Sequence, residues 1–218
     1  MIDCIRLVPI YRKKNYDTLN LPMNEQYWDK KLKIHTSGRD ESRADRFCYP
    51  YEPTPYCVLE RLAQSGYITR NSNLVDYGCG KGRVGIFLSA QTGCKAVGVE
   101  YDERILEQAA HNLKCCGRTQ NLTLVCADAR EYQPEGADCF YFFNPFSAEI
   151  LGSVLQNIKG QWYSAPRPMR LFFYYPNDDY RRLLAEDPLL VLAEEIDCRD
   201  LFGGSDRREC ILVYQISE

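Results

Sequence analysis

Short apolar runs alternate with amphipathic stretches along most of the chain. Runs rich in β-branched and aromatic residues are typical of buried strands, and they predict strands at 74–77, 96–100, 122–126, 139–143 and 170–175. Apolar residues at helical spacing predict helices at 56–65, 83–91, 102–116, 147–158 and 177–185. This alternation indicates an α/β fold with a doubly wound, mostly parallel sheet and right-handed crossovers.

Two more strands, at 189–196 and 210–215, close the chain. The loop between them carries Gly203 and Gly204 and leaves no room for a crossover helix. Strands that are joined without such a helix pair antiparallel. We therefore expect a seven-stranded sheet that ends in an antiparallel hairpin.

Residues 1–48 differ from the rest, because charge is dense there and no long hydrophobic period holds. We interpret them as an irregular N-terminal extension with a short strand over 3–10 and one helix, and residues 49–218 as the main domain. The extension could recognise a substrate, cover a ligand or be a solvated surface arm. Thr54 is placed to cap the first helix of the main domain, with Pro55 at its first position.

A glycine-rich turn follows the first of the alternating strands. Asp76 lies in that strand, and Gly78, Gly80 and Gly82 alternate with other residues before the next helix. Glycine permits positive φ and lets a ligand approach the main chain, so such a turn is typical of nucleotide-like cofactor sites. The spacing fits neither the dinucleotide fingerprint, because Arg83 holds the third glycine position, nor a phosphate-binding P-loop.

Acids follow the next strands at matching places. Glu100 closes the second strand twenty positions after Gly80, and an ionised carboxylate there can accept hydrogen bonds from both hydroxyls of a ribose. Asp128 follows the third strand. Either acid alone would be an ordinary surface residue at a strand end, and the ordered set favours a nucleoside ligand.

The acid-x-Gly-x-Gly-x-Gly motif resembles motif I of the class I S-adenosylmethionine-dependent methyltransferases. With Pro-Thr-Pro-Tyr before it and Asn-Pro-Phe after it, the chain is similar to a small bacterial group of that family over about residues 49–218. The resemblance implies a Rossmann-like fold and S-adenosylmethionine as the cofactor. It assigns to the cofactor site Asp76, Tyr77, Gly78, Gly80, Gly82, Glu100, Tyr101, Asp128, Ala129 and Asn144.

Within that site the resemblance implies particular roles. Asp76 would lie near the cofactor's amino group, Glu100 on its ribose, and Asp128 with the Ala129 amide at its adenine. In this fold the segment before the first helix, here 49–56, often folds over the cofactor. Arg83 beside the glycines could attract a phosphate, and we favour the simpler interpretation that it pairs with an acid on a neighbouring helix.

The fourth strand runs into Asn144, Pro145 and Phe146, which are the candidate catalytic residues. Amino-directed methyltransferases carry [DNS]-P-P-[YFW] there, so the resemblance implies that Asn144 accepts a hydrogen bond from the target and that an aromatic ring covers it. This chain has one proline, and its aromatic residue comes one position early. That departure puts nucleobase N-methylation in doubt. Asn144 could instead cap the helix that opens near Ser147.

The amino-acid composition limits the kinds of partner that the chain could bind. A net charge of −3 and a pI near 5.6 argue against a protein that coats nucleic acid. The chain has 11 cysteines without a C-x-x-C pair, which indicates reduced thiols in a cytoplasmic protein and no metal site. We expect no membrane partner, because no apolar run is long enough to span a bilayer.

The function that we expect is transfer of a methyl group from S-adenosylmethionine to an acceptor by in-line displacement. The acceptor could be a small molecule, a protein or RNA, since a fold does not name a substrate, and the oligomeric state is not readable. A non-catalytic cofactor-binding or scaffold protein is the main alternative. A nucleic-acid N-methyltransferase and a nicotinamide-dependent oxidoreductase are lesser ones.

Overall fold

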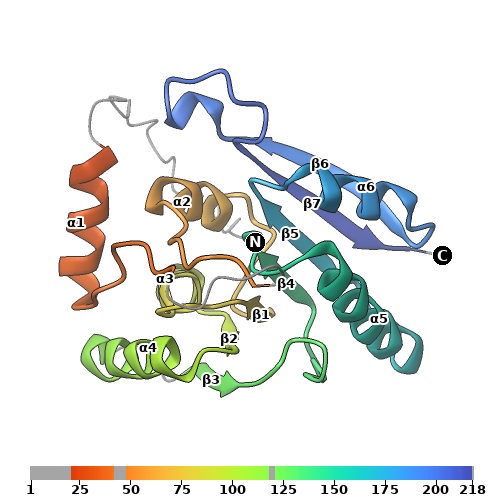
Figure 1. The fold of residues 1–218 in the computed structure, drawn as a ribbon, viewed down its shortest axis with the longest axis horizontal. Coiled ribbons are helices and arrows are strands. Elements are labelled where there is room, and N and C mark those ends of the chain that lie inside the picture. Colours follow the sequence, from red (N-terminus) through yellow and green to blue (C-terminus); the bar gives the residue numbers. More distant parts are fainter. Residues whose placement is uncertain (1–20, 42–47, 118–120, 218) are drawn as a thin grey trace, which may run out of the picture.

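The computed structural model describes residues 21–41, 48–117 and 121–217 (Figure 1). The strand expected over 3–10 lies outside them. Seven strands form one sheet in the order β3-β2-β1-β4-β5-β7-β6. Their bounds are β1 (Asn73–Tyr77), β2 (Lys95–Glu100), β3 (Leu122–Cys126), β4 (Cys139–Phe142), β5 (Arg170–Tyr174), β6 (Leu190–Asp197) and β7 (Cys210–Ile216).

The first five strands are parallel, and β7 inserts antiparallel between β5 and β6. Each parallel strand therefore ends at the same edge of the sheet, which is where open α/β sheets bind ligands. The predicted doubly wound fold with a C-terminal antiparallel hairpin is confirmed.

Helices cover both faces of the sheet. They are α1 (Leu21–Leu32), α2 (Tyr56–Gln64), α3 (Arg83–Thr92), α4 (Glu103–Cys116), α5 (Ala148–Ser164) and α6 (Asp178–Glu186). The first four lie on one face, and α5 and α6 lie on the other (Figure 1). Side chains at three N-termini accept a backbone hydrogen bond and so fix where the helices begin, namely Asp102, Ser147 and Asn177.

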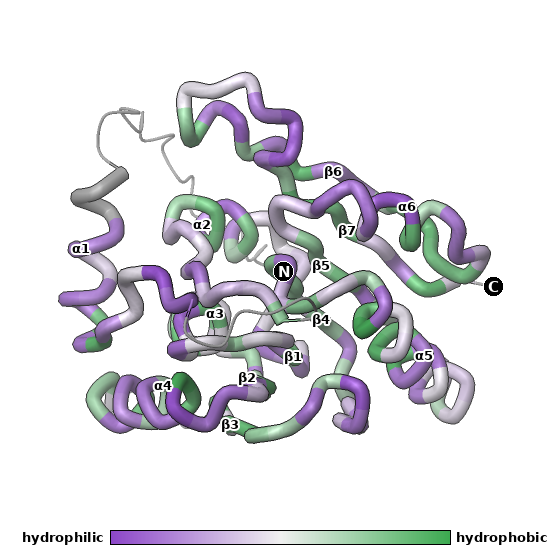
Figure 2. Tube along the Cα trace, in the orientation of Figure 1, coloured by the Kyte–Doolittle hydropathy of each residue, from purple (hydrophilic) through white to green (hydrophobic). Residues whose placement is uncertain are grey.

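An aromatic stack runs through the middle of the sheet. The rings of Tyr77 and Phe142 lie 5.1 Å apart and those of Phe142 and Phe173 lie 4.8 Å apart, both nearly parallel. All of these side chains are buried. In Figure 2 β5 is green, while the connection between β6 and β7 is mostly purple. The apolar interior holds the parallel strands rigidly below the functional edge.

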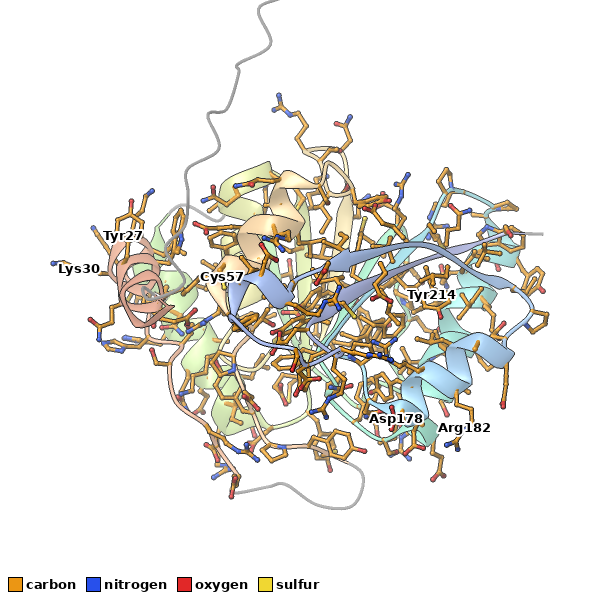
Figure 3. The ribbon with its side chains drawn as sticks, turned by 90° about the horizontal axis from the view of Figure 1, so that it is seen from above. Tyr27, Lys30, Cys57, Asp178, Arg182 and Tyr214 are labelled. Carbon is orange, nitrogen blue, oxygen red and sulfur yellow. The ribbon has the colours of Figure 1, made fainter. Side chains whose placement is uncertain are left out.

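Helix α1 packs its inner side against the main core. Trp28 is 7% exposed, and its ring lies 4.9 Å from that of Phe87 in α3. Lys30 points away from the sheet on the outer side of α1, and Tyr27 on the same helix is exposed (Figure 3). Trp28, Leu32 and Ile34 thus share the core of the strands, and the proposed boundary at residue 48 stays a prediction.

Thr54 does not cap α2, so that prediction was wrong. The helix begins at Tyr56, and the Tyr56 amide donates to Oε1 of Glu25 in α1 at 2.8 Å. The Thr54 hydroxyl lies instead 3.0 Å from the Tyr141 hydroxyl inside the core. A carboxylate thus takes the capping place, which leaves Thr54 free to satisfy the buried phenol.

Candidate active site

A cavity of about 220 Å³ lies at the carboxyl edge of the sheet. Its walls come from the ends of β1, β2 and β4, from the loop after β3 and from residues 48–54. The backbone amide of Tyr49 donates to the carbonyl of Pro145 at 3.2 Å, which ties the segment 48–54 to the loop after β4. Chain far apart in sequence is thereby gathered around one space.

The glycines of the loop are needed for conformation and for space. Gly78, Gly80 and Gly82 have φ of +71°, +53° and +82°, which other residues adopt only under strain. A Cβ on Gly78 would lie 2.3 Å from Cβ of Pro145, and one on Gly80 would lie 2.2 Å from the ring of Tyr51. The loop can therefore pack tightly between the end of β4 and the segment 48–54.

Asp76 is the most perturbed acid of the cavity. Its side chain is 2% exposed, and Oδ2 has no hydrogen-bond partner among the described residues. Burial, with a smaller effect of the Glu100 carboxylate, raises the pKa of Asp76 to about 8. The group is therefore mostly protonated at neutral pH, and a cationic ligand beside it would restore its charge.

Glu100 lies across the loop from Asp76 and is fixed by backbone amides. Its Oε2 accepts from Gly80 at 2.9 Å, and Oε1 accepts from Tyr101 at 2.9 Å and from Asp102 at 3.0 Å. Burial raises the pKa of Glu100, while these amides oppose the rise. The carboxylate is oriented, and Oε2 keeps capacity for a ligand hydroxyl.

The loop after β3 forms a more open wall. The Asp128 carboxylate accepts from the backbone and the guanidinium of Arg130 at 2.9 and 3.0 Å, and this pairing lowers its pKa. Ala129 lines the cavity beside it, and Tyr101 stands opposite with 60% of its surface exposed. These residues leave an opening for a planar group.

Arg83 connects the glycine loop to the N-terminal segment. Its Nη1 pairs with Glu25 and donates to the Thr54 carbonyl at 3.0 Å, and its Nε donates to the Thr36 hydroxyl at 2.7 Å. The guanidinium also lies 4.2 Å from the ring centroid of Tyr56. The predicted pairing with an acid on another helix is confirmed. Glu25 and Thr36 were missed, because nothing in their local sequence signals a contact with this loop.

Asn144 faces away from the cavity, with a φ of +41°. Its Nδ2 donates to the Tyr175 carbonyl at 2.7 Å, and its Oδ1 accepts from the Asn177 amide at 3.3 Å. It does not cap α5, because Ser147 does. Pro145 and Phe146, in contrast, line the cavity.

The structure brings together most of the predicted cofactor residues. Those that line the cavity are Asp76, Tyr77, Gly78, Glu100, Tyr101, Asp128 and Ala129. Gly80, Gly82 and Asn144 are not among its lining residues. Among the described residues no group of three or more His, Cys, Asp or Glu side chains could hold a metal ion. None of the described helices is long and apolar enough to cross a membrane.

Comparison with known proteins identifies the domain. Residues 74–160 match the methyltransferase domain family. A protein-lysine N-methyltransferase of Saccharolobus islandicus is 32% identical over 77 residues, which are 35% of this chain and 48% of that protein. The chain spans about half or less of the length of the curated relatives that it matches.

Solved structures share the fold. An RNA methyltransferase from Salinibacter ruber, in complex with S-adenosyl-L-homocysteine, has a TM-score of 0.50 and 20% identity, covering 76% of this chain and 92% of its own. A TehB-like S-adenosylmethionine-dependent methyltransferase from Corynebacterium glutamicum has a TM-score of 0.54 and 17% identity, covering 93% and 100%. With its motif I turn, this strand order and a methyltransferase domain match over residues 74–160, the chain has the fold of the class I S-adenosylmethionine-dependent methyltransferases.

Proposed function

We propose that the chain is an enzyme that binds S-adenosylmethionine in this cavity and moves its methyl group to an acceptor by in-line displacement. The observation that carries the proposal is the state of Asp76. A carboxyl that is 2% exposed, with one oxygen unpartnered among the described residues and a pKa raised to about 8, suits a site for a cationic amine.

The residues present fit the rest of that cofactor. Glu100 is oriented by amides and can take a ribose hydroxyl. Asp128 and the Ala129 backbone stand where an adenine would find a hydrogen-bond acceptor and donor. Tyr101, which is largely exposed at the rim, can cover a planar ring.

The chain's own contribution is binding and alignment. The bound cofactor supplies a methyl group already activated by a positive sulfur. Pro145 and Phe146 form an apolar wall that excludes water from the reacting end, and alignment of acceptor and methyl group supplies much of the rate. Pro145 is held by its contact with Gly78 and by its hydrogen bond from Tyr49.

One observation bears on the alternatives. Both polar atoms of the Asn144 side chain are engaged within the protein and Asn144 does not line the cavity, so that residue is not placed to accept from a nucleobase amino group. This weighs against nucleobase N-methylation. It also keeps open a non-catalytic cofactor-binding protein, which detection of S-adenosylhomocysteine formed with any acceptor fraction of a cell extract would exclude.

Calorimetric titration with S-adenosylhomocysteine tests the proposal. We expect binding in the micromolar range for the wild type and at least about 30-fold weaker binding for Glu100→Ala, because a charge-assisted hydrogen bond is lost. Glu103→Ala, at an exposed position in the first turn of α4, is the matched control and should bind like the wild type. Absence of binding by the wild type would overturn the proposal.

A further inference from the structure

The side of the cavity nearest β4 and β5 is both aromatic and acidic. Phe143 lines the cavity, and its ring centroid lies 4.8 Å from that of Tyr174 and 6.5 Å from that of Tyr175. The Tyr174 hydroxyl donates to Glu209 at 2.9 Å, and Glu52 lines the cavity beside this group. We call Glu52, Phe143, Tyr174, Tyr175 and Glu209 the acceptor mouth.

The two carboxylates of the mouth come from segments that are far apart in the sequence. Burial raises the pKa of Glu209, with smaller contributions from the Asp206 and Glu52 carboxylates, while the bond from Tyr174 and the Arg208 charge oppose the rise. Among the described residues Glu52 forms a loose ion pair with Arg39 at 3.8 Å, and both side chains are more than half exposed. Screened pairs of this kind are weak, so Glu52 can turn to an arriving cation.

Carboxylates already engage the cationic side chains in the described lining of the cavity. Its cationic side chains are Arg83 and Arg130. Arg83 is paired with Glu25, and Arg130 is paired with Asp128. A phosphate or carboxylate on the acceptor would therefore compete with these carboxylates for a counter-charge, which raises its desolvation cost.

The protein itself places a cation on the aromatic surface of the mouth. The guanidinium of Arg208 lies 4.5 Å from the ring centroid of Tyr175, and it pairs with Asp206 at 3.0 Å. Aromatic faces with adjacent carboxylates are the usual binding surface for organic cations. One ring of the mouth therefore already contacts a positive nitrogen.

We propose that the methyl acceptor is an aliphatic amine, either free or on a lysine side chain, held as its ammonium form by Glu52 and Glu209 across the ring of Phe143. The inference rests on the proposed function and names the substrate class of the same site. The proposed substrate class excludes acceptors that carry a phosphate or a phenol.

Methyl transfer to an amine needs no strong base on the protein. The bound ammonium first loses a proton to water. The nitrogen lone pair then forms the N–C bond while the S–C bond breaks, and the electrons of that bond go to sulfur. The products are a methylated ammonium and a neutral thioether. Because an alkyl amine has a pKa near 10, turnover should rise as the pH is raised toward about 9 to 10.

The experiment follows labelled methyl transfer from S-adenosylmethionine to four probes. These are a linear alkyl diamine, a lysine-containing peptide, catechol and an oligoribonucleotide. We expect label on the diamine or the peptide, with turnover increasing with pH, and the comparison of these two distinguishes a free amine from a protein lysine. Preferential labelling of catechol or RNA, or no labelled amine from protein that binds S-adenosylhomocysteine, would overturn the inference and leave the proposed function standing.

Substitutions at the acceptor mouth test where the amine binds. Glu52→Gln and Glu209→Gln should each raise KM for the labelled amine by about fivefold or more, with kcat and S-adenosylhomocysteine affinity within about twofold. Glutamine keeps the bond from Tyr174, so Glu209→Gln preserves the local structure. Glu41→Gln removes an equal charge from an exposed neighbour that does not line the cavity, and it should change nothing. An unchanged KM in both mouth variants would refute the assignment, and failure of the wild type to bind S-adenosylhomocysteine would overturn both proposals.

Discussion

The two halves of the functional edge hold their loops by different means. After β1 and β2, ionisable side chains are buried around the glycine loop, with Asp76 and Arg83 each 2% exposed. After β4 and β5, the loop is held by the uncharged hydrogen bonds of Asn144. Burying charge is costly unless a partner compensates it. The first half therefore presents a buried carboxyl to a charged ligand group, whereas the loop of the second half is held without buried charge.

Removal of the Arg83 charge should have the largest effect. Arg83→Met keeps most of the volume but leaves Glu25 and Asp29 near an apolar side chain. Breaking a buried ion pair from one side costs roughly 3–5 kcal/mol of the free energy of unfolding. Urea denaturation measures this loss.

Lys81→Met provides the comparison within the same loop. Lys81 donates to the Ser37 carbonyl at 3.0 Å and stands 5.0 Å from the ring centroid of Tyr51, near the surface. Its replacement should cost about 1 kcal/mol or less. Equal losses of unfolding free energy for Arg83→Met and Lys81→Met would show that a buried charge in this loop stabilises the fold no more than an exposed one.

The sequence predicts the sheet well because strand and helix signals are local. Apolar runs mark every strand, and the observed β3 has the bounds that its pattern predicts. The contact of Glu25 with the α2 amide joins residues 31 positions apart, and no local pattern reports it. For the same reason Thr54 looked like a cap although its hydroxyl turns to Tyr141.

The candidate site likewise has features that the sequence predicts and features that it does not. A motif can place Asp76 and Glu100 at strand ends, because spacing fixes where a strand ends. Whether a side chain faces the cavity depends on the φ of its own residue and on the next loop, as the +41° of Asn144 and its bond to Tyr175 show. The unusual state of Asp76 arises from burial, which its motif does not contain.

A second prediction concerns how the burial of Asp76 lowers the free energy of unfolding. The pKa of Asp76 rises from 3.8 to about 8 on folding, so its contribution to stability is complete below about pH 4 and is lost as the pH rises through 8. Asp76→Asn removes this dependence. It should come closest to the wild type near pH 4 and exceed its free energy of unfolding by about 2 kcal/mol or more at pH 9.

Stability and binding should move in opposite directions in that variant. Asp76→Asn cannot present a negative charge, so its affinity for S-adenosylhomocysteine should fall by at least about tenfold. Urea unfolding at both pH values, with calorimetry on the same samples, measures the two effects. A variant less stable than the wild type at pH 9 would show that Asp76 is not a strained functional group.

Substitution of Asn144 should have the smallest effect, and it tests the second half of the functional edge, after β4 and β5. Asn144→Gly suits the positive φ but loses the hydrogen bonds to the Tyr175 carbonyl and from the Asn177 amide, at a cost of about 1–2 kcal/mol of unfolding free energy. Asn144→Ala adds backbone strain of about 1 kcal/mol, so the difference between the variants separates conformation from bonding. S-adenosylhomocysteine affinity should stay within about twofold for both, since the side chain faces away from the cavity. If Asn144→Gly weakened binding as strongly as Asp76→Asn, Asn144 would be a cofactor ligand as its sequence position predicts, and the two halves would form one polar site.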